Sequence, residues 1–87
     1  MHEAGLIAGL MRRILEVAEA ENASRVVGAS VWLGALSHMS AAHLAEHFAR
    51  AAAGTIAEGA ALDIELSGDA THAEADGIVL HSVEVES

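Results

Sequence analysis

The sequence predicts an α+β domain in which two helices pack on a three-stranded mixed sheet, in the order α-β-α-β-β. Two segments carry apolar residues at helical spacing, and three shorter segments alternate apolar with polar residues or are rich in valine. Asn, Ser and Gly residues separate these five segments. With 87 residues, the chain forms one small domain, residues 1–87, that can bury roughly 60–65% of its unfolded surface.

The first element is expected to be an amphipathic helix from residue 4 to about residue 21. Arginines and glutamates occupy its polar faces, and Asn22-Ala23-Ser24 is expected to end it. The residues expected on its buried face are Leu6, Ile7, Leu10, Met11, Ile14, Leu15 and Ala18.

A valine-rich strand is expected over residues 25–33. Its alternation predicts one buried face made of Val27, Ala29, Val31 and Leu33, with Val26 and Trp32 on the opposite face. Trp32 is expected to fill space in the core or on the sheet face. Because two helices can cover only one side of the sheet, the face carrying Trp32 is also a candidate for homodimer formation or for docking of a partner.

A second helix is expected over residues 41–53, with Ser40 as its N-cap and Gly54 at its end. Its buried stripe is predicted to contain Leu44, Ala45, Phe48, Ala51 and Ala52. After a turn over residues 55–59, a strand is expected over 60–66, with Leu62, Ile64 and Leu66 on one face.

The last strand is expected over residues 78–86, after a polar loop over 67–77. Val79, Val83 and Val85 do not keep one parity with Ile78 and Leu80. This pattern predicts either a strand that is buried on both faces at its start or a β-bulge.

The charge of the chain excludes several classes of partner. Four basic and 13 acidic residues give a formal charge of −9, and there is no lysine. A field of this sign repels phosphate backbones and anionic lipid, so neither nucleic acid nor a membrane surface is expected as a partner. Cysteine is absent, which excludes disulfides and thiolate metal sites. No targeting segment is visible, and the expected location is the cytoplasm.

The opening tripeptide Met1-His2-Glu3 has the composition of a metal chelator. A terminal amine, the His2 backbone nitrogen after deprotonation and His2 Nδ1 can close fused rings around one ion. Such nitrogen ligation suits Ni(II) or Cu(II). Glu3 is a candidate for the fourth position, and an acidic residue there also stabilises a helix N-terminus by about 0.3–1 kcal/mol.

Several segments, taken in order, resemble the HypA-type hydrogenase and urease nickel-incorporation proteins. They are Met1-His2-Glu3 leading into a helix, Val31–Ser37 (VWLGALS), the second helix with Leu44 and Phe48, residues 54–65 (GTIAEGAALDIE) and Leu80–Val85 (LHSVEV). The resemblance implies Ni(II) uptake by Met1, His2 and Glu3. It also implies delivery of the metal, with a maturation GTPase, to the large subunit of a [NiFe]-hydrogenase or to urease.

The chain departs from the family in two places. Family members carry a zinc module with two Cys-x-x-Cys pairs between the last two strands, whereas only the loop 67–77 stands there and no structural zinc is expected. Ser40 replaces the family's acidic residue at the start of the second helix. The chain is therefore a minimal nickel metallochaperone, or else an accessory interaction module of hydrogenase maturation that no longer carries metal.

The remaining histidines offer weaker candidates. His72, in the loop 67–77, is the extra ligand considered for nickel, although an ordinary exposed loop residue is the simpler interpretation; His38 and His81 are similar. His43-Leu44-Ala45-Glu46-His47 matches the H-x-x-E-H pattern of inverted zinc peptidases. That activity needs a third ligand, a cleft and a larger domain, so we expect no enzyme and interpret the segment as a solvated helix face.

Overall fold

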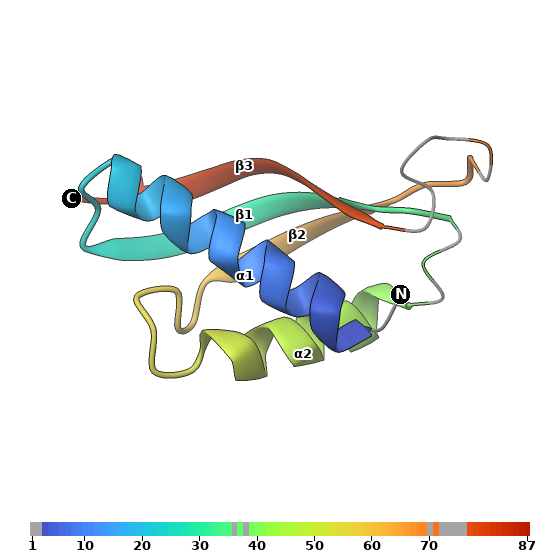
Figure 1. The fold of residues 1–87 in the computed structure, drawn as a ribbon, viewed down its shortest axis with the longest axis horizontal. Coiled ribbons are helices and arrows are strands. Elements are labelled where there is room, and N and C mark those ends of the chain that lie inside the picture. The colour runs from blue at the N-terminus through green and yellow to red at the C-terminus, as the bar shows by residue number, and fades with distance from the viewer. Residues whose placement is uncertain (1–2, 36, 38, 70, 72–76) are drawn as a thin grey trace.

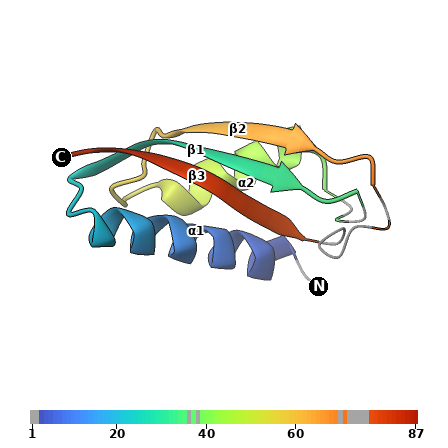
Figure 2. The ribbon, with the colours of Figure 1, turned by 90° about the horizontal axis from the view of Figure 1, so that it is seen from above.

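The order of helices and strands agrees with the sequence prediction. The computed structural model describes residues 3–35, 37, 39–69, 71 and 77–87. Its elements are α1 (Glu3–Ala20), β1 (Arg25–Leu33), α2 (Ala41–Ala52), β2 (Ala61–Leu66) and β3 (Ile78–Glu86). Both helices lie against the same face of the sheet (Figures 1 and 2), so the described elements form two layers.

The sheet is mixed, with strand order β2-β1-β3. β1 pairs with β2 in parallel and with β3 in antiparallel orientation. The parallel pair requires a crossover, and α2 provides it. α1 precedes the sheet in sequence, and Figure 2 shows it running alongside β3.

α1 ends because Asn22 adopts a left-handed backbone conformation, with φ of 54°. The Asn22 N–H donates to the Glu19 carbonyl oxygen at 3.0 Å, and the Ala23 N–H donates to that of Ala18 at 2.9 Å. These two bonds form a Schellman motif, which satisfies carbonyl groups that the end of a helix leaves free. The predicted break after residue 21 is thereby confirmed.

α2 begins where the sequence places its cap. The Ser40 hydroxyl accepts a hydrogen bond from the His43 backbone N–H at 3.1 Å. Gly54 follows the helix with φ of 82°. Leu44, Phe48 and Ala52 form the buried stripe, but Ala45 and Ala51 are exposed. The prediction for these two alanines was wrong because each is rotated about 100° around the helix from a stripe residue.

Two bulges set which strand residues enter the core. β1 has an extra residue at Val27, between the pairs Val26–Val85 and Gly28–Glu84. The bulge changes the parity of β1, so Val26 is buried and Val27 only half-buried. This corrects the prediction that Val27 shares the buried face and Val26 the open one.

The second bulge lies in β3, where the sequence left two alternatives open. Ser82 pairs with Ser30 and Leu80 with Val31, so His81 is the extra residue. Ile78 and Leu80 before the bulge, and Val83 and Val85 after it, all pack against the core. Val79 instead pairs with Trp32. The change of parity in the sequence therefore marks a bulge.

The core lies between the sheet and the helices and uses mainly aliphatic residues. Leu6, Leu15, Leu62 and Ile64 pack partly buried against it. Leu66, however, is 61% exposed at the end of the edge strand β2, which corrects the prediction that it is buried with Leu62 and Ile64. The buried members are Ile7, Leu10, Met11, Ile14, Ala18, Val26, Ala29, Val31, Leu33, Met39, Leu44, Phe48, Ala52 and Ala57.

Candidate metal-binding site at the amino terminus

The predicted nickel ligands fall mostly outside the part of the chain that the structure describes. Met1 and His2 precede the first described residue, and Glu3 is the first residue of α1. His72 and His38 also lie outside the described residues. The ligand set Met1, His2 and Glu3, with His72 as the extra candidate, therefore stays a prediction.

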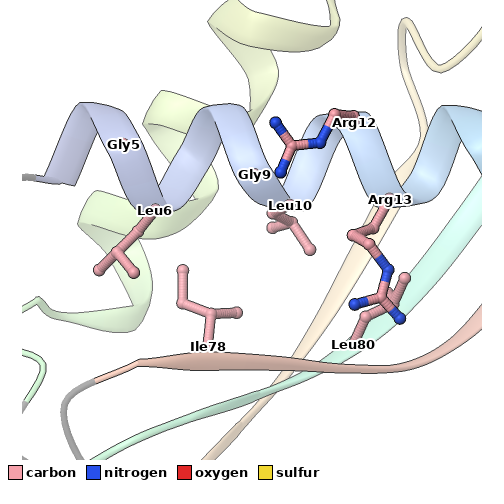
Figure 3. A pocket seen from close by; sticks show the side chains of 8 residues that line it. All are labelled: Gly5, Leu6, Gly9, Leu10, Arg12, Arg13, Ile78 and Leu80. Carbon is pink, nitrogen blue, oxygen red and sulfur yellow. The ribbon is translucent and has the colours of Figure 1, made fainter.

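The described residues at the start of α1 border a hollow beside β3. The first three turns of α1 lie along the beginning of β3, and a hollow of about 260 Å³ separates them. Figure 3 shows Leu6 and Leu10 pointing toward Ile78, with the Arg13 side chain reaching toward Leu80. The complete lining is Gly5, Leu6, Gly9, Leu10, Arg12, Arg13, Ile78 and Leu80.

This hollow was not predicted from the sequence. The signal was present, because Gly5 and Gly9 lie one turn apart on α1 and leave room where larger side chains would stand. The sequence did not show which strand lies beside α1, because the packing of α1 against β3 rather than β2 follows from the strand order.

Two hydrogen bonds fix the ends of the loop 67–77 beside the end of β1. The Ser67 N–H donates to the Leu33 carbonyl oxygen at 2.9 Å, and the Gly34 N–H donates to the Gly77 carbonyl oxygen at 2.9 Å. The loop therefore starts and ends at the edge of the molecule from which α1 also begins (Figure 1). Ser67 and Gly77, at the two ends of the loop, therefore lie at the same end of the fold as the start of α1.

The first part of this loop has local order of its own. The Asp69 N–H donates to the Ser67 hydroxyl at 3.0 Å. The carboxylate of Asp69 accepts from the Thr71 N–H at 2.9 Å and from the Thr71 hydroxyl at 2.7 Å. Short side chains that bond nearby backbone groups in this way stabilise turns.

The H-x-x-E-H segment lies on α2 with its two histidines one turn apart. The ring centroids of His43 and His47 are 4.5 Å apart and their planes are tilted by 51°. The Glu46 carboxylate forms an ion pair with the Arg50 guanidinium, one turn further along the helix. Among the described residues, no group of three or more His, Cys, Asp or Glu side chains is placed to hold one metal ion. The third ligand that an inverted zinc peptidase needs is therefore missing from this part of the chain.

The open face of the sheet carries Trp32 among acidic residues. Trp32 lies between Glu65 of β2 and Val79 of β3, and Ser30 pairs with Asp63. Glu84 and Glu86 extend this row along β3. Of the two helices, neither covers this face (Figure 1), which agrees with the predicted placement of Trp32.

His81, the bulge residue of β3, is exposed. Over the described residues, no helix is long and apolar enough to span a membrane.

A family model for hydrogenase/urease nickel incorporation metallochaperones, HypA, matches residues 1–73. The chain belongs to the HypA family. Hydrogenase maturation factor HypA 1 of Bradyrhizobium diazoefficiens is 41% identical over 69 residues. The match includes 78% of this chain and 61% of that protein, so the chain spans about three fifths of the length of this relative.

Two solved structures share the fold of this HypA-family chain. The nickel metallochaperone HypA from Helicobacter pylori superposes with a TM-score of 0.80, at 18% identity, over 100% of this chain and 99% of that one. A second HypA solution structure gives a TM-score of 0.74, also at 18% identity, over 98% and 96% of the two chains. At this identity the likeness confirms the α-β-α-β-β fold, while the family model and the relative confirm the resemblance found in the sequence.

Proposed function

We propose that this HypA-family chain binds Ni(II) as cargo at its amino terminus and delivers it during maturation of a nickel enzyme, most directly a [NiFe]-hydrogenase. Membership of a family described as nickel-incorporating metallochaperones carries this proposal. The tripeptide Met1-His2-Glu3 supports it, because an amine, a backbone nitrogen and an imidazole form a set of ligands that Ni(II) accepts.

The start of α1 at Glu3 suits such a chelate. The first four N–H groups of a helix have no intrahelical partner. A metal can therefore take a backbone nitrogen at this position without removing a helical hydrogen bond. The positive end of the helix dipole opposes a bound cation, while the carboxylate of an acidic residue offsets part of this effect. We infer a site that binds nickel and releases it readily, as a carrier requires.

The partners proposed are a maturation GTPase and the hydrogenase large subunit, with urease as the other possible recipient. The cytoplasm is the compartment that we expect. We propose no catalytic activity and no structural zinc, since the loop 67–77 replaces the zinc module and the chain lacks cysteine. The open sheet face around Trp32 is the surface that we propose for homodimer formation or partner docking.

Restoration of hydrogenase maturation tests this function. Cells that lack their own HypA would be supplied with the native chain or with His2→Ala, and the nickel content of the purified large subunit would be measured. We expect nickel insertion with the native chain and loss of insertion with His2→Ala. A His81→Asn variant serves as a matched control, since His81 is exposed on the sheet.

An accessory interaction module is the second candidate, favoured by the exposed row of acidic residues around Trp32. It predicts that His2→Ala matures the hydrogenase as well as the native chain does. It further predicts that Trp32→Ala, which leaves the terminus intact, abolishes maturation and capture of the GTPase.

A further inference from the structure

Two imidazole rings meet on the surface of α2, away from the amino terminus. His43 and His47 are separated by one helical turn, and their ring centroids lie 4.5 Å apart. Residues at positions i and i+4 share a helix face, but only particular side-chain rotamers bring their rings this close. The two imidazole rings therefore already lie beside each other on the surface of α2.

The backbone beneath these rings is held firmly. Leu44 and Phe48, each next to one of the histidines in sequence, are 0% and 2% exposed. Ser40 caps the first turn through the His43 N–H. Because packing and capping fix this turn, the two imidazoles keep their spacing without a further loss of backbone entropy when a ligand binds.

Both rings lie at the surface of the molecule, where solvent reaches them. His43 is exposed and His47 half-buried, and His47 borders a shallow hollow between α1 and α2 that Ile7, Met11 and Arg50 also line. The Arg50 guanidinium is bound to the Glu46 carboxylate, so its positive charge is offset beside the histidines. The formal charge of −9 on the chain further favours approach of a cation.

We propose that His43 and His47 form a second metal site, a bis-imidazole site for a borderline divalent ion such as Ni(II) or Zn(II). Imidazole nitrogens suit both ions, and paired histidines at i and i+4 on a helix are an established arrangement for zinc. Two protein ligands leave the other coordination positions to water, so the ion exchanges freely. The site does not depend on the proposed terminal chelate.

The test uses the full chain carrying His2→Ala, which removes the terminal chelate. Zn(II) alone is titrated while the imidazole C–H resonances of the histidines are followed by NMR, and Ni(II) uptake is measured by calorimetry. We expect saturable shifts of the His43 and His47 resonances together and uptake of a single Ni(II) per chain. His43→Asn or His47→Asn should abolish both signals, whereas His81→Asn should leave them unchanged.

A second measurement distinguishes loss of metal binding from unfolding of the variants. Zn(II) should raise the Tm of the His2→Ala protein, because a ligand that binds only the folded state stabilises it. The rise should vanish in His43→Asn while its metal-free Tm stays close to that of the parent. Equal metal binding in the His43→Asn, His47→Asn and parent proteins, or shifts confined to other histidines, would overturn the proposal.

Discussion

Gly34 donates its backbone N–H to the carbonyl oxygen of Gly77, 2.9 Å away, and this bond joins the end of β1 to the residue before β3. With the bond from Ser67 to Leu33, it closes both ends of the loop 67–77 on the sheet. A segment held in this way can be lengthened or shortened at modest entropic cost. The two bonds therefore hold the end of β2 and the start of β3 beside the end of β1, the strand with which both pair.

Replacing residues 70–76 by a Gly-Ser linker of the same length should leave the domain folded. The two anchoring bonds lie outside the replaced segment, so we predict a change in the free energy of unfolding within about 0.5 kcal/mol. Urea unfolding followed by circular dichroism measures it. Although this variant removes His72, we predict unchanged Ni(II) binding, because we interpret His72 as an ordinary loop residue and not as a ligand. Loss of nickel binding would instead make His72 a ligand.

Ser40→Ala should destabilise the domain by about 0.5–2 kcal/mol because it removes the N-cap of α2. Ser40→Asp should keep the stability, since a carboxylate accepts the same hydrogen bond from the His43 N–H. Denaturant unfolding of both variants provides the comparison, with Ser82→Ala, an exposed serine of β3, as control. Equal stability of Ser40→Ala and the parent would contradict the capping role.

Leu44→Ala should cost about 2–5 kcal/mol, because Leu44 is 0% exposed and its truncation leaves a cavity in the core. Leu66→Ala removes the same atoms from a side chain that is 61% exposed, and we predict a change within about 0.5 kcal/mol. The two variants are compared by thermal and urea unfolding. A similar loss in both would mean that the end of β2 is buried in solution.

Nickel affinity at the terminus should rise as the pH increases. The amine and imidazole nitrogens bind metal only when deprotonated, so protons compete with Ni(II). An α-amino group ordinarily titrates near pH ~7.7–8.0, and the steepest change is expected on approaching that range. Titration of Ni(II) at several pH values checks this sign. Affinity that is independent of pH would exclude the amine as a ligand.

The sequence was sufficient to predict the five elements and their order because each has a strong local signal. The stripe of α1 repeats at helical spacing, and Asn22 and Ser40 mark helix ends through specific hydrogen bonds. The burial of Val26 instead of Val27 was not predictable, since the bulge depends on pairing with Glu84 and Val85 more than fifty residues later. Leu66 keeps the alternation of the strand, yet as the last residue of the edge strand β2 it is exposed.

The candidate site was predicted by a different kind of signal. The residue types of Met1-His2-Glu3 and the ordered resemblance indicated nickel, and the family match agrees with that indication. The pairing of the His43 and His47 rings needed coordinates, because spacing on a helix permits the contact without fixing the rotamers. The common end from which α1 and the loop 67–77 emerge needed the strand order.

The most direct test is a calorimetric Ni(II) titration of the chain with Met1 as its free first residue, in a His43→Asn/His47→Asn background that removes the proposed histidine site on α2. The same titration would be run after adding His2→Ala, and after adding a Gly-Ser extension of several residues before Met1. We predict that a single Ni(II) binds the native terminus and that both changes abolish binding. Unchanged binding in either altered protein, or no uptake by the native terminus, would contradict the terminal chelate.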